Sequence, residues 1–162
     1  MPYPPPKELL EYLAAYDEPV RTLALATRNV VLKEMAPCLE SVVDAYNAVA
    51  LGYGPTECLR DMVCHIAVYP EHVNIGLNRG SEIDAPPSLL EGSGRRTRHI
   101  TIRTTVELKN PAVKTCLRTA RELAGMKQST RHLKGVTTVI KKPYARKRRP
   151  HPGRARAASS AR

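Results

Sequence analysis

The feature that most constrains the fold is a pair of apolar runs within residues 60–80, separated by the turn Tyr-Pro-Glu-His at residues 69–72. Two such runs, rich in Val, Ile and Leu, predict a β-hairpin. Pro70 cannot adopt the positive φ that a tight type I′ turn requires, so we expect a four-residue loop. The resulting register places six apolar side chains on one face, which another layer must cover. These side chains are Cys64, Ile66, Val68, Val73, Ile75 and Leu77.

Helices are expected on both sides of this hairpin along the chain. Apolar residues recur at the helical period in four segments, at residues 7–16, 18–35, 37–46 and 111–124. Asp17 and Asn110 are suitable N-caps, and each precedes a proline in the first turn of the segment that follows. The helical spacing of the third segment rests on Leu39, Val42, Val43 and Tyr46.

Further strands are predicted at residues 47–54 and 98–105, and more weakly at residues 135–140. Prolines and glycines exclude a long regular element at residues 81–97, which we expect to form a structured loop. This order predicts an α+β domain of two layers, an antiparallel β-meander with helices packed on one face. We divide the chain into a Pro-rich start with a short helix (1–17), an α+β domain (18–126) and a basic tail (127–162).

The net charge of +11 belongs to the C-terminal part of the chain. Residues 127–162 contain twelve Lys and Arg and no Asp or Glu, whereas residues 1–126 contain fourteen basic and fifteen acidic residues. This composition predicts a disordered tail. Such an arm binds nucleic acid or another polyanion through phosphates, or serves only to keep the protein soluble. The densest group of its cations comprises Lys141, Lys142, Arg146, Lys147, Arg148 and Arg149.

The sequence also bounds the compartment and the chemistry. The first residues lack a signal peptide's charged and apolar regions, and no apolar run approaches the roughly 18 residues of a membrane helix, so we expect a cytosolic protein. The cysteines lack zinc-like spacing and are expected to be reduced, small buried hydrophobes. They are Cys38, Cys58, Cys64 and Cys116. We find no catalytic motif, which favours a binding protein over an enzyme.

Residues 72–104 resemble the YdhG-like family, a group of bacterial domains of unknown function, within a likeness that spans residues 18–125. The family pattern is a strand ending in glycine, a Leu-Leu-Glu-Gly turn, a Gly-rich loop with a basic residue, and an Arg-His pair that opens a strand. The matching positions are Gly80, Leu89-Leu90-Glu91-Gly92, Gly92-Ser93-Gly94-Arg95 and Arg98-His99. Some relatives are described as frataxin-like iron chaperones, so the resemblance implies iron handling or delivery.

Iron held at a protein surface needs several carboxylates or imidazoles that converge on one patch. The densest acidic group, Glu8, Glu11, Asp17 and Glu18, is also typical of a solvated face near helix starts. If the strand at residues 98–105 lies beside the hairpin, His65, His72 and His99 share the polar sheet face with Tyr69 and Arg103. Three imidazoles are a candidate metal ligand set, and the alternative is an ordinary wetted face.

A Gly/Arg loop is the candidate anion site. It comprises Gly92, Ser93, Gly94, Arg95, Arg96 and Arg98, with Arg103 in the following strand. Its glycines let the backbone approach a ligand and its guanidinium groups suit phosphate or carboxylate, although a solvated turn is the alternative. It is not a P-loop, because a strand follows it. The sequence therefore predicts a small binding domain that handles iron, as the resemblance implies, or that binds anions or nucleic acid.

Overall fold

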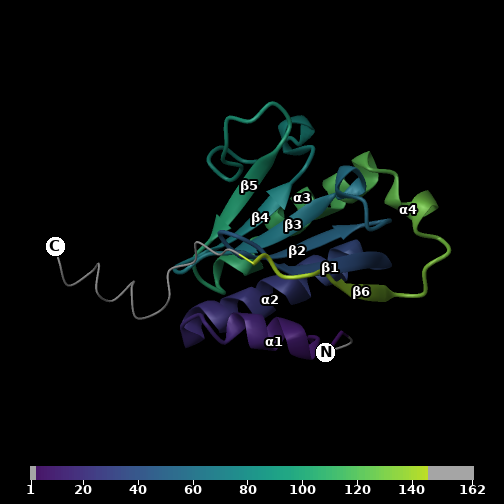
Figure 1. The fold of residues 1–162 in the computed structure, drawn as a ribbon. Coiled ribbons are helices and arrows are strands. Elements are labelled where there is room, and N and C mark those ends of the chain that lie inside the picture. The colour runs from purple at the N-terminus through teal and green to yellow at the C-terminus, as the bar shows by residue number, and fades with distance from the viewer. Residues whose placement is uncertain (1–2, 146–162) are drawn as a thin grey trace.

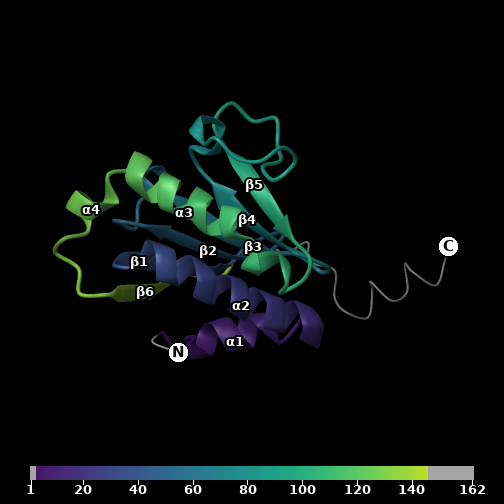
Figure 2. The same ribbon diagram turned by 180° about the vertical axis from the view of Figure 1, so that it is seen from behind.

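The computed structural model describes residues 3–145, which form a six-stranded sheet with helices on one face (Figures 1 and 2). The strand order is β5-β4-β3-β2-β1-β6. The helices are α1 (Lys7–Leu13), α2 (Glu18–Met35), α3 (Pro111–Leu123) and α4 (Met126–Ser129). The strands are β1 (Cys38–Asp44), β2 (Val49–Gly54), β3 (Cys64–Val68), β4 (Val73–Leu77), β5 (Arg98–Ile102) and β6 (Val136–Ile140). The predicted α+β class is confirmed.

The hairpin at the centre of the prediction is formed by β3 and β4. Its register pairs Val68 with Val73, Ile66 with Ile75 and Cys64 with Leu77, as expected. The backbone N–H of Tyr69 donates to the carbonyl of His72 over 2.9 Å and closes the four-residue loop. Pro70 therefore decides the turn, and the alternation of side chains decides which face is buried.

The core lies between the sheet and the helices. In Figure 2, α2 and α3 cross in front of the strands, so the inward side chains of β3, β4 and β5 face them. Ile66 and Ile75 have no exposed surface and Ile100 is 1 % exposed. Complete burial of such a side chain contributes about 1.5–3 kcal/mol. The opposite face carries no α-helix among residues 3–145 and is seen from the front in Figure 1.

The prediction of a helix at residues 37–46 is wrong, because this segment forms strand β1. Its buried positions are Cys38, Glu40, Val42 and Asp44, an alternation that contains two carboxylates. The alternation of buried and less buried residues could not be recognised in the sequence, because Glu40 and Asp44 occupy buried positions and acidic residues are rarely fully buried unless they are paired. Val42 and Val43 then matched a helical period by coincidence.

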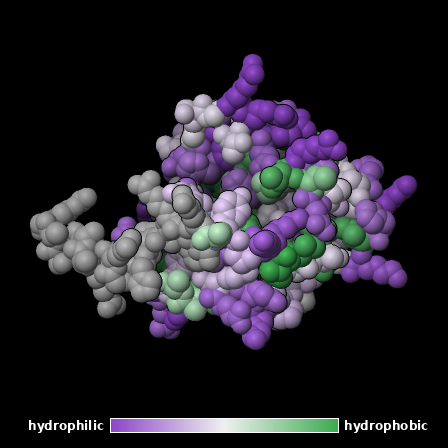
Figure 3. All heavy atoms as spheres, viewed as in Figure 1, coloured by the Kyte–Doolittle hydropathy of each residue, from purple (hydrophilic) through white to green (hydrophobic). Residues whose placement is uncertain are grey.

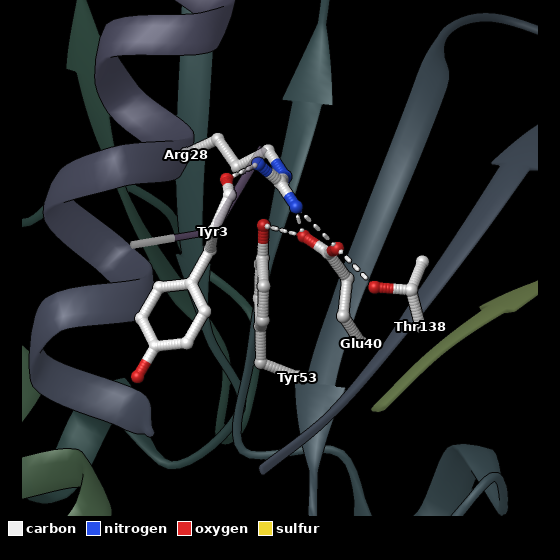
Figure 4. Close-up of polar contacts among 5 residues, drawn as sticks. All are labelled: Tyr3, Arg28, Glu40, Tyr53 and Thr138. Atoms are coloured by element: carbon white, nitrogen blue, oxygen red, sulfur yellow. Dashed lines mark hydrogen bonds and ion pairs between the residues drawn. The ribbon is translucent and has the colours of Figure 1, made fainter. Parts of the chain in front are cut away.

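Glu40 is buried because a hydrogen-bonded network holds it (Figure 4). Arg28 of α2 donates from Nε and Nη2 to the two carboxylate oxygens, each over 2.9 Å. The hydroxyls of Tyr53 and Thr138 donate to the same carboxylate over 3.0 and 2.9 Å. Arg28 Nη1 donates to the carbonyl of Tyr3 over 2.8 Å. The ion pair joins α2 to β1, and the hydrogen bonds around it connect β2, β6 and the N-terminal segment to the same two side chains.

The fold continues past the expected domain boundary at residue 127. Helix α4 and strand β6 follow it, and β6 pairs with β1 in parallel, from Cys38 with Val136 to Val42 with Ile140. The sheet is thus mixed, and its other neighbouring strands are antiparallel. The weak strand predicted at residues 135–140 is real because β1 offers it an edge. Arg146, Lys147, Arg148 and Arg149 of the predicted polyanion tail lie outside the described residues.

The expected helix ends are largely confirmed. Asn110 Oδ1 accepts a hydrogen bond from the N–H of Ala112 over 3.0 Å, so Asn110 caps α3. Gly125 follows α3 with φ of 63°, a conformation that suits glycine. Asp17 precedes α2 but makes no side-chain cap hydrogen bond.

Within residues 3–145, no helix is both long enough and apolar enough to span a membrane.

Candidate ligand-binding cleft

The described part of the chain contains an open cleft of about 850 Å³. It lies at the end of the sheet where β2 ends, β3 begins, β4 ends and β5 begins. Three walls enclose it: the segment after β2 (residues 55–63), the start of the loop after β4 together with residues 96–97, and the C-terminal end of α3 with α4. The cleft is therefore assembled from segments that are distant in the sequence.

Basic side chains come from all three walls. The guanidinium-bearing residues are Arg60, Arg79 and Arg96, and His132 adds an imidazole beyond α4. Asp61 is the one carboxylate among the lining residues, and its Oδ1 lies 4.0 Å from Arg60 Nε. The lining thus carries an excess of positive charge, which favours an anionic ligand.

Arg79 is held in place by two elements. Its Nε and Nη2 donate to the Glu82 carboxylate over 2.5 and 2.7 Å, and its Nη1 donates to the carbonyl of Leu123 over 2.6 Å. The hydrogen bond from Arg79 lowers the pKa of Glu82, and the same contact raises the pKa of Arg79. Arg79 therefore ties the loop after β4 to the last turn of α3 and fixes the cleft wall.

The structure separates the arginines of the predicted Gly/Arg loop. Arg96 lines the cleft, and its carbonyl accepts a hydrogen bond from the N–H of Ser81 over 2.9 Å. Arg98 instead closes the loop, since its Nη1 donates to the carbonyls of Gly94 and Thr97. Arg95 is exposed and is not among the cleft residues.

The remaining members of that prediction lie away from the cleft lining. Gly92, Ser93 and Gly94 form an exposed turn, in which Gly92 has φ of 120°. Arg103 follows β5 at the opposite end of the sheet, where its backbone N–H donates to Glu107 Oε2 over 2.7 Å. Of the predicted guanidinium groups, Arg96 is therefore the one that the fold brings into the cleft.

The histidines predicted as metal ligands lie on the open sheet face, but they do not form a ligand set. His65 pairs with Gly76, which pairs with His99 on the next strand. His99 Nε2 lies 3.6 Å from Glu91 Oε2, whereas His72 stacks on Tyr69 with ring centroids 4.9 Å apart. Among residues 3–145, no three His, Cys, Asp or Glu side chains form a group that could hold a metal ion.

His65 borders the cleft and depends on a glycine beside it. A Cβ at Gly76 would lie 2.0 Å from His65 Cε1, so the imidazole packs against the bare Cα of that residue. Burial lowers the pKa of His65, although a hydrogen bond with Asn78 opposes this effect. Burial therefore favours the neutral form of the ring.

The cleft also has an apolar part. Pro55, Leu59, Met62 and Val63 line one wall, and Leu59 is 81 % exposed. Figure 3 shows the apolar surface on this side of the molecule as small patches separated by hydrophilic side chains. Patches of this kind suit a small ligand with an apolar part better than a broad protein interface.

The sequence analysis did not predict most of the basic residues of the cleft. Arg60, Arg79 and His132 stand alone in three separate segments, and no motif spacing connects them. Only the strand order and the position of α3 bring them together with Arg96. Comparisons of the chain with protein-family models, with curated proteins and with solved structures find no match.

Proposed function

We propose that the protein is a small binding domain that takes an organic anion into the cleft. The observation that carries this proposal is the convergence of Arg60, Arg79 and Arg96 on one cavity from three separate segments. Guanidinium groups bind phosphate and carboxylate through paired hydrogen bonds, which gives geometric specificity as well as attraction.

The charge balance of the cleft supports an anionic ligand. Glu82 is engaged by Arg79, and Asp61 accepts a hydrogen bond from the hydroxyl of Thr56 over 2.7 Å. Among the described residues, Arg79 rather than Arg96 forms the ion pair with Glu82, although the charge of Arg96 also helps to lower the pKa of Glu82. The Arg96 guanidinium is therefore the group most available to a bound anion.

The size and lining of the cleft support an organic ligand. A volume of about 850 Å³ falls in the range that encloses a molecule of drug size, and an inorganic anion would leave most of it filled with water. Leu59 and Met62 offer apolar contact beside the guanidinium groups. The family resemblance suggests iron handling instead, but no ligand group within residues 3–145 supports that role.

Calorimetric titration with phenyl phosphate, benzoate and inorganic phosphate tests the proposal. We expect saturable binding of at least one aromatic anion and weaker binding of inorganic phosphate. Arg96→Gln should weaken that binding by about tenfold, the usual effect of losing one charged hydrogen bond. Arg95→Gln is the matched control, because it removes the same charge one residue away and outside the lining.

Two outcomes would contradict the proposal. Equal losses in the Arg95→Gln and Arg96→Gln variants would indicate non-specific attraction to the loop rather than binding in the cleft. Absence of saturable heat with every aromatic anion at millimolar concentration would remove the organic anion as the ligand class.

A further inference from the structure

We propose that the outer edge of strand β6 binds an extended acidic segment of a partner protein, which joins the sheet as an additional strand. In this mode of peptide recognition, backbone hydrogen bonds supply affinity and side chains beside the strand supply specificity. The site consists of β6 with Lys134 and Lys142 beyond its two ends. None of residues 134–142 lines the cleft, and the inference is independent of the function proposed for the cleft.

The two edges of the sheet differ in how the chain covers them. β5 is the last strand on one side and β6 is the last on the other (Figures 1 and 2). The loop before β5 covers its edge, because the N–H of His99 donates to the carbonyl of Glu91 over 2.9 Å and the N–H of Glu91 donates to the carbonyl of His99 over 2.8 Å. Within residues 3–145, no backbone hydrogen bond covers the outer edge of β6 in this way. β6 is therefore the edge that the described chain leaves open.

The register of β6 identifies the backbone groups at this edge. The carbonyl of Gly135 accepts a hydrogen bond from the N–H of Cys38 over 3.0 Å, and the N–H of Lys141 donates to the carbonyl of Val42 over 2.8 Å. The odd-numbered residues of this segment thus bond to β1, and the residues between them direct their backbone groups away from it. The outward groups belong to Val136, Thr138 and Ile140.

The residues of β6 hold this edge in an extended conformation. All 5 of them are Val, Thr or Ile, whose branched side chains favour strands. Val136 and Ile140 pack against the core, and the hydroxyl of Thr138 donates to Glu40 over 2.9 Å. The edge is therefore formed before a partner binds, which lowers the entropic cost of binding.

The charges around β6 favour an acidic partner. Residues 127–142 contain five Lys and Arg and no Asp or Glu. Lys141 is engaged by Glu57, with its Nζ 2.8 Å from Oε2, whereas Lys134 and Lys142 are exposed. Carboxylates at the two ends of an added strand would lie beside these two ammonium groups, and opposite charges on neighbouring strands attract.

The same cations disfavour a second copy of the chain at this edge. Antiparallel pairing of two β6 strands about Thr138 would use all of the outward backbone groups. That register places Lys134 of one copy opposite Lys142 of the other, because both lie four residues from Thr138. Like charges directly opposite each other destabilise a strand pair. An acidic segment instead meets opposite charge at both ends.

Fluorescence anisotropy with a labelled peptide of alternating Val and Thr, flanked by two Glu at each end, tests the inference on the full chain. We expect saturable binding of this peptide. One control peptide carries N-methyl groups on two adjacent central residues, which block an N–H on each edge of the peptide without changing its charge. A second control peptide has Lys in place of Glu. Both should bind at least about tenfold more weakly, because each lacks hydrogen bonds or charge that the edge requires.

Variants of β6 test the backbone contacts separately from the charges. Val136→Pro should weaken binding by about three- to tenfold, because it removes one outward N–H at the first position of the strand, where proline is tolerated. Val136→Ala is its control, because it shortens the same side chain and keeps the N–H. Lys134→Gln and Lys142→Gln should each weaken binding by about two- to fivefold. The charge-matched Lys109→Gln, in the segment after β5, should have no effect.

Thermal unfolding of each variant shows that the fold is retained before affinities are compared, and every variant keeps the other basic residues of the chain. Equal binding of the unmodified and N-methylated peptides would overturn the inference, since it would show attraction of charge without strand addition. Equal losses in the Lys109→Gln and Lys134→Gln variants would show that the attraction is not specific to this edge. Dimerisation in sedimentation velocity that Val136→Pro abolishes would assign the edge to a second copy of the chain instead.

Discussion

Arg28 and Glu40 form a bidentate ion pair in which the arginine side chain is 2 % exposed and the glutamate side chain has no exposed surface. Twelve residues separate them, and the pair links α2 to β1. Arg28 Nε, Nη1 and Nη2 and both carboxylate oxygens of Glu40 form hydrogen bonds within the protein. The pair therefore organises the core and offers no open ligand site. The loss of one partner leaves the other charged and buried.

Glu40→Gln should therefore lower the free energy of unfolding by roughly 3–5 kcal/mol, as found when one member of a buried ion pair is removed. Urea denaturation followed by circular dichroism measures the change. Glu11→Gln is the control, because its pair with Lys7 is exposed and should contribute less than about 1 kcal/mol. Equal effects of the two substitutions would contradict a structural role for the buried pair.

Gly76→Ala should destabilise the protein by about 1–3 kcal/mol, because the new Cβ would lie 2.0 Å from the His65 ring. In a double-mutant cycle, His65→Ala should recover most of that loss, since it removes the side chain that the Cβ meets. Gly94→Ala is the control, because the nearest atom to its Cβ would be 3.5 Å away. Additive effects at positions 65 and 76 would show that the two residues are not in contact.

Cysteine reactivity should be confined to one thiol in the folded protein. Cys58 is exposed, whereas Cys38, Cys64 and Cys116 are buried. Burial raises the pKa of Cys38 to about 12 and raises the pKa of Cys64 and Cys116, so these thiols hold little thiolate at pH 8. A disulfide-exchange reagent such as DTNB should titrate one thiol in native protein and four in denaturant. Cys58→Ser should remove the native reaction, and a fast signal that persists would place a second thiol at the surface.

The contact between Arg79 and Glu82 should contribute to stability in a pH-dependent way. The folded-state pKa of Glu82 lies below its ordinary value of 4.5, so its contribution is present above that pH and is lost as the pH falls through the folded-state value. Glu82→Gln should lower the melting temperature by a few degrees at most at pH 7, because the pair is partly exposed. The difference from wild type should vanish in acid. A difference that stays constant down to pH 3 would assign the effect to something other than the charge.

The sequence by itself determined the elements whose signals are local. Pro70 and the alternation from Cys64 to Leu77 predicted the hairpin register, because a turn and a period of two leave little choice of pairing. Asn110 and Gly125 predicted the two ends of α3, because a capping residue acts on the helix turn beside it and needs no distant partner.

Tertiary structure alone decided the features that depend on distant partners. Strand β1 contains Glu40 on its buried side, and in the sequence this residue interrupts the alternation of apolar residues. Its burial depends on the ion pair with Arg28, which is twelve residues away in the chain. Strand β6 is short and exists as a strand because β1 provides an edge. The cleft needs Arg60, Arg79, Arg96 and His132, and the sheet order sets their separation. Local periodicity fixes conformation over a few residues, whereas a binding surface is made by contacts between segments that carry no shared local pattern.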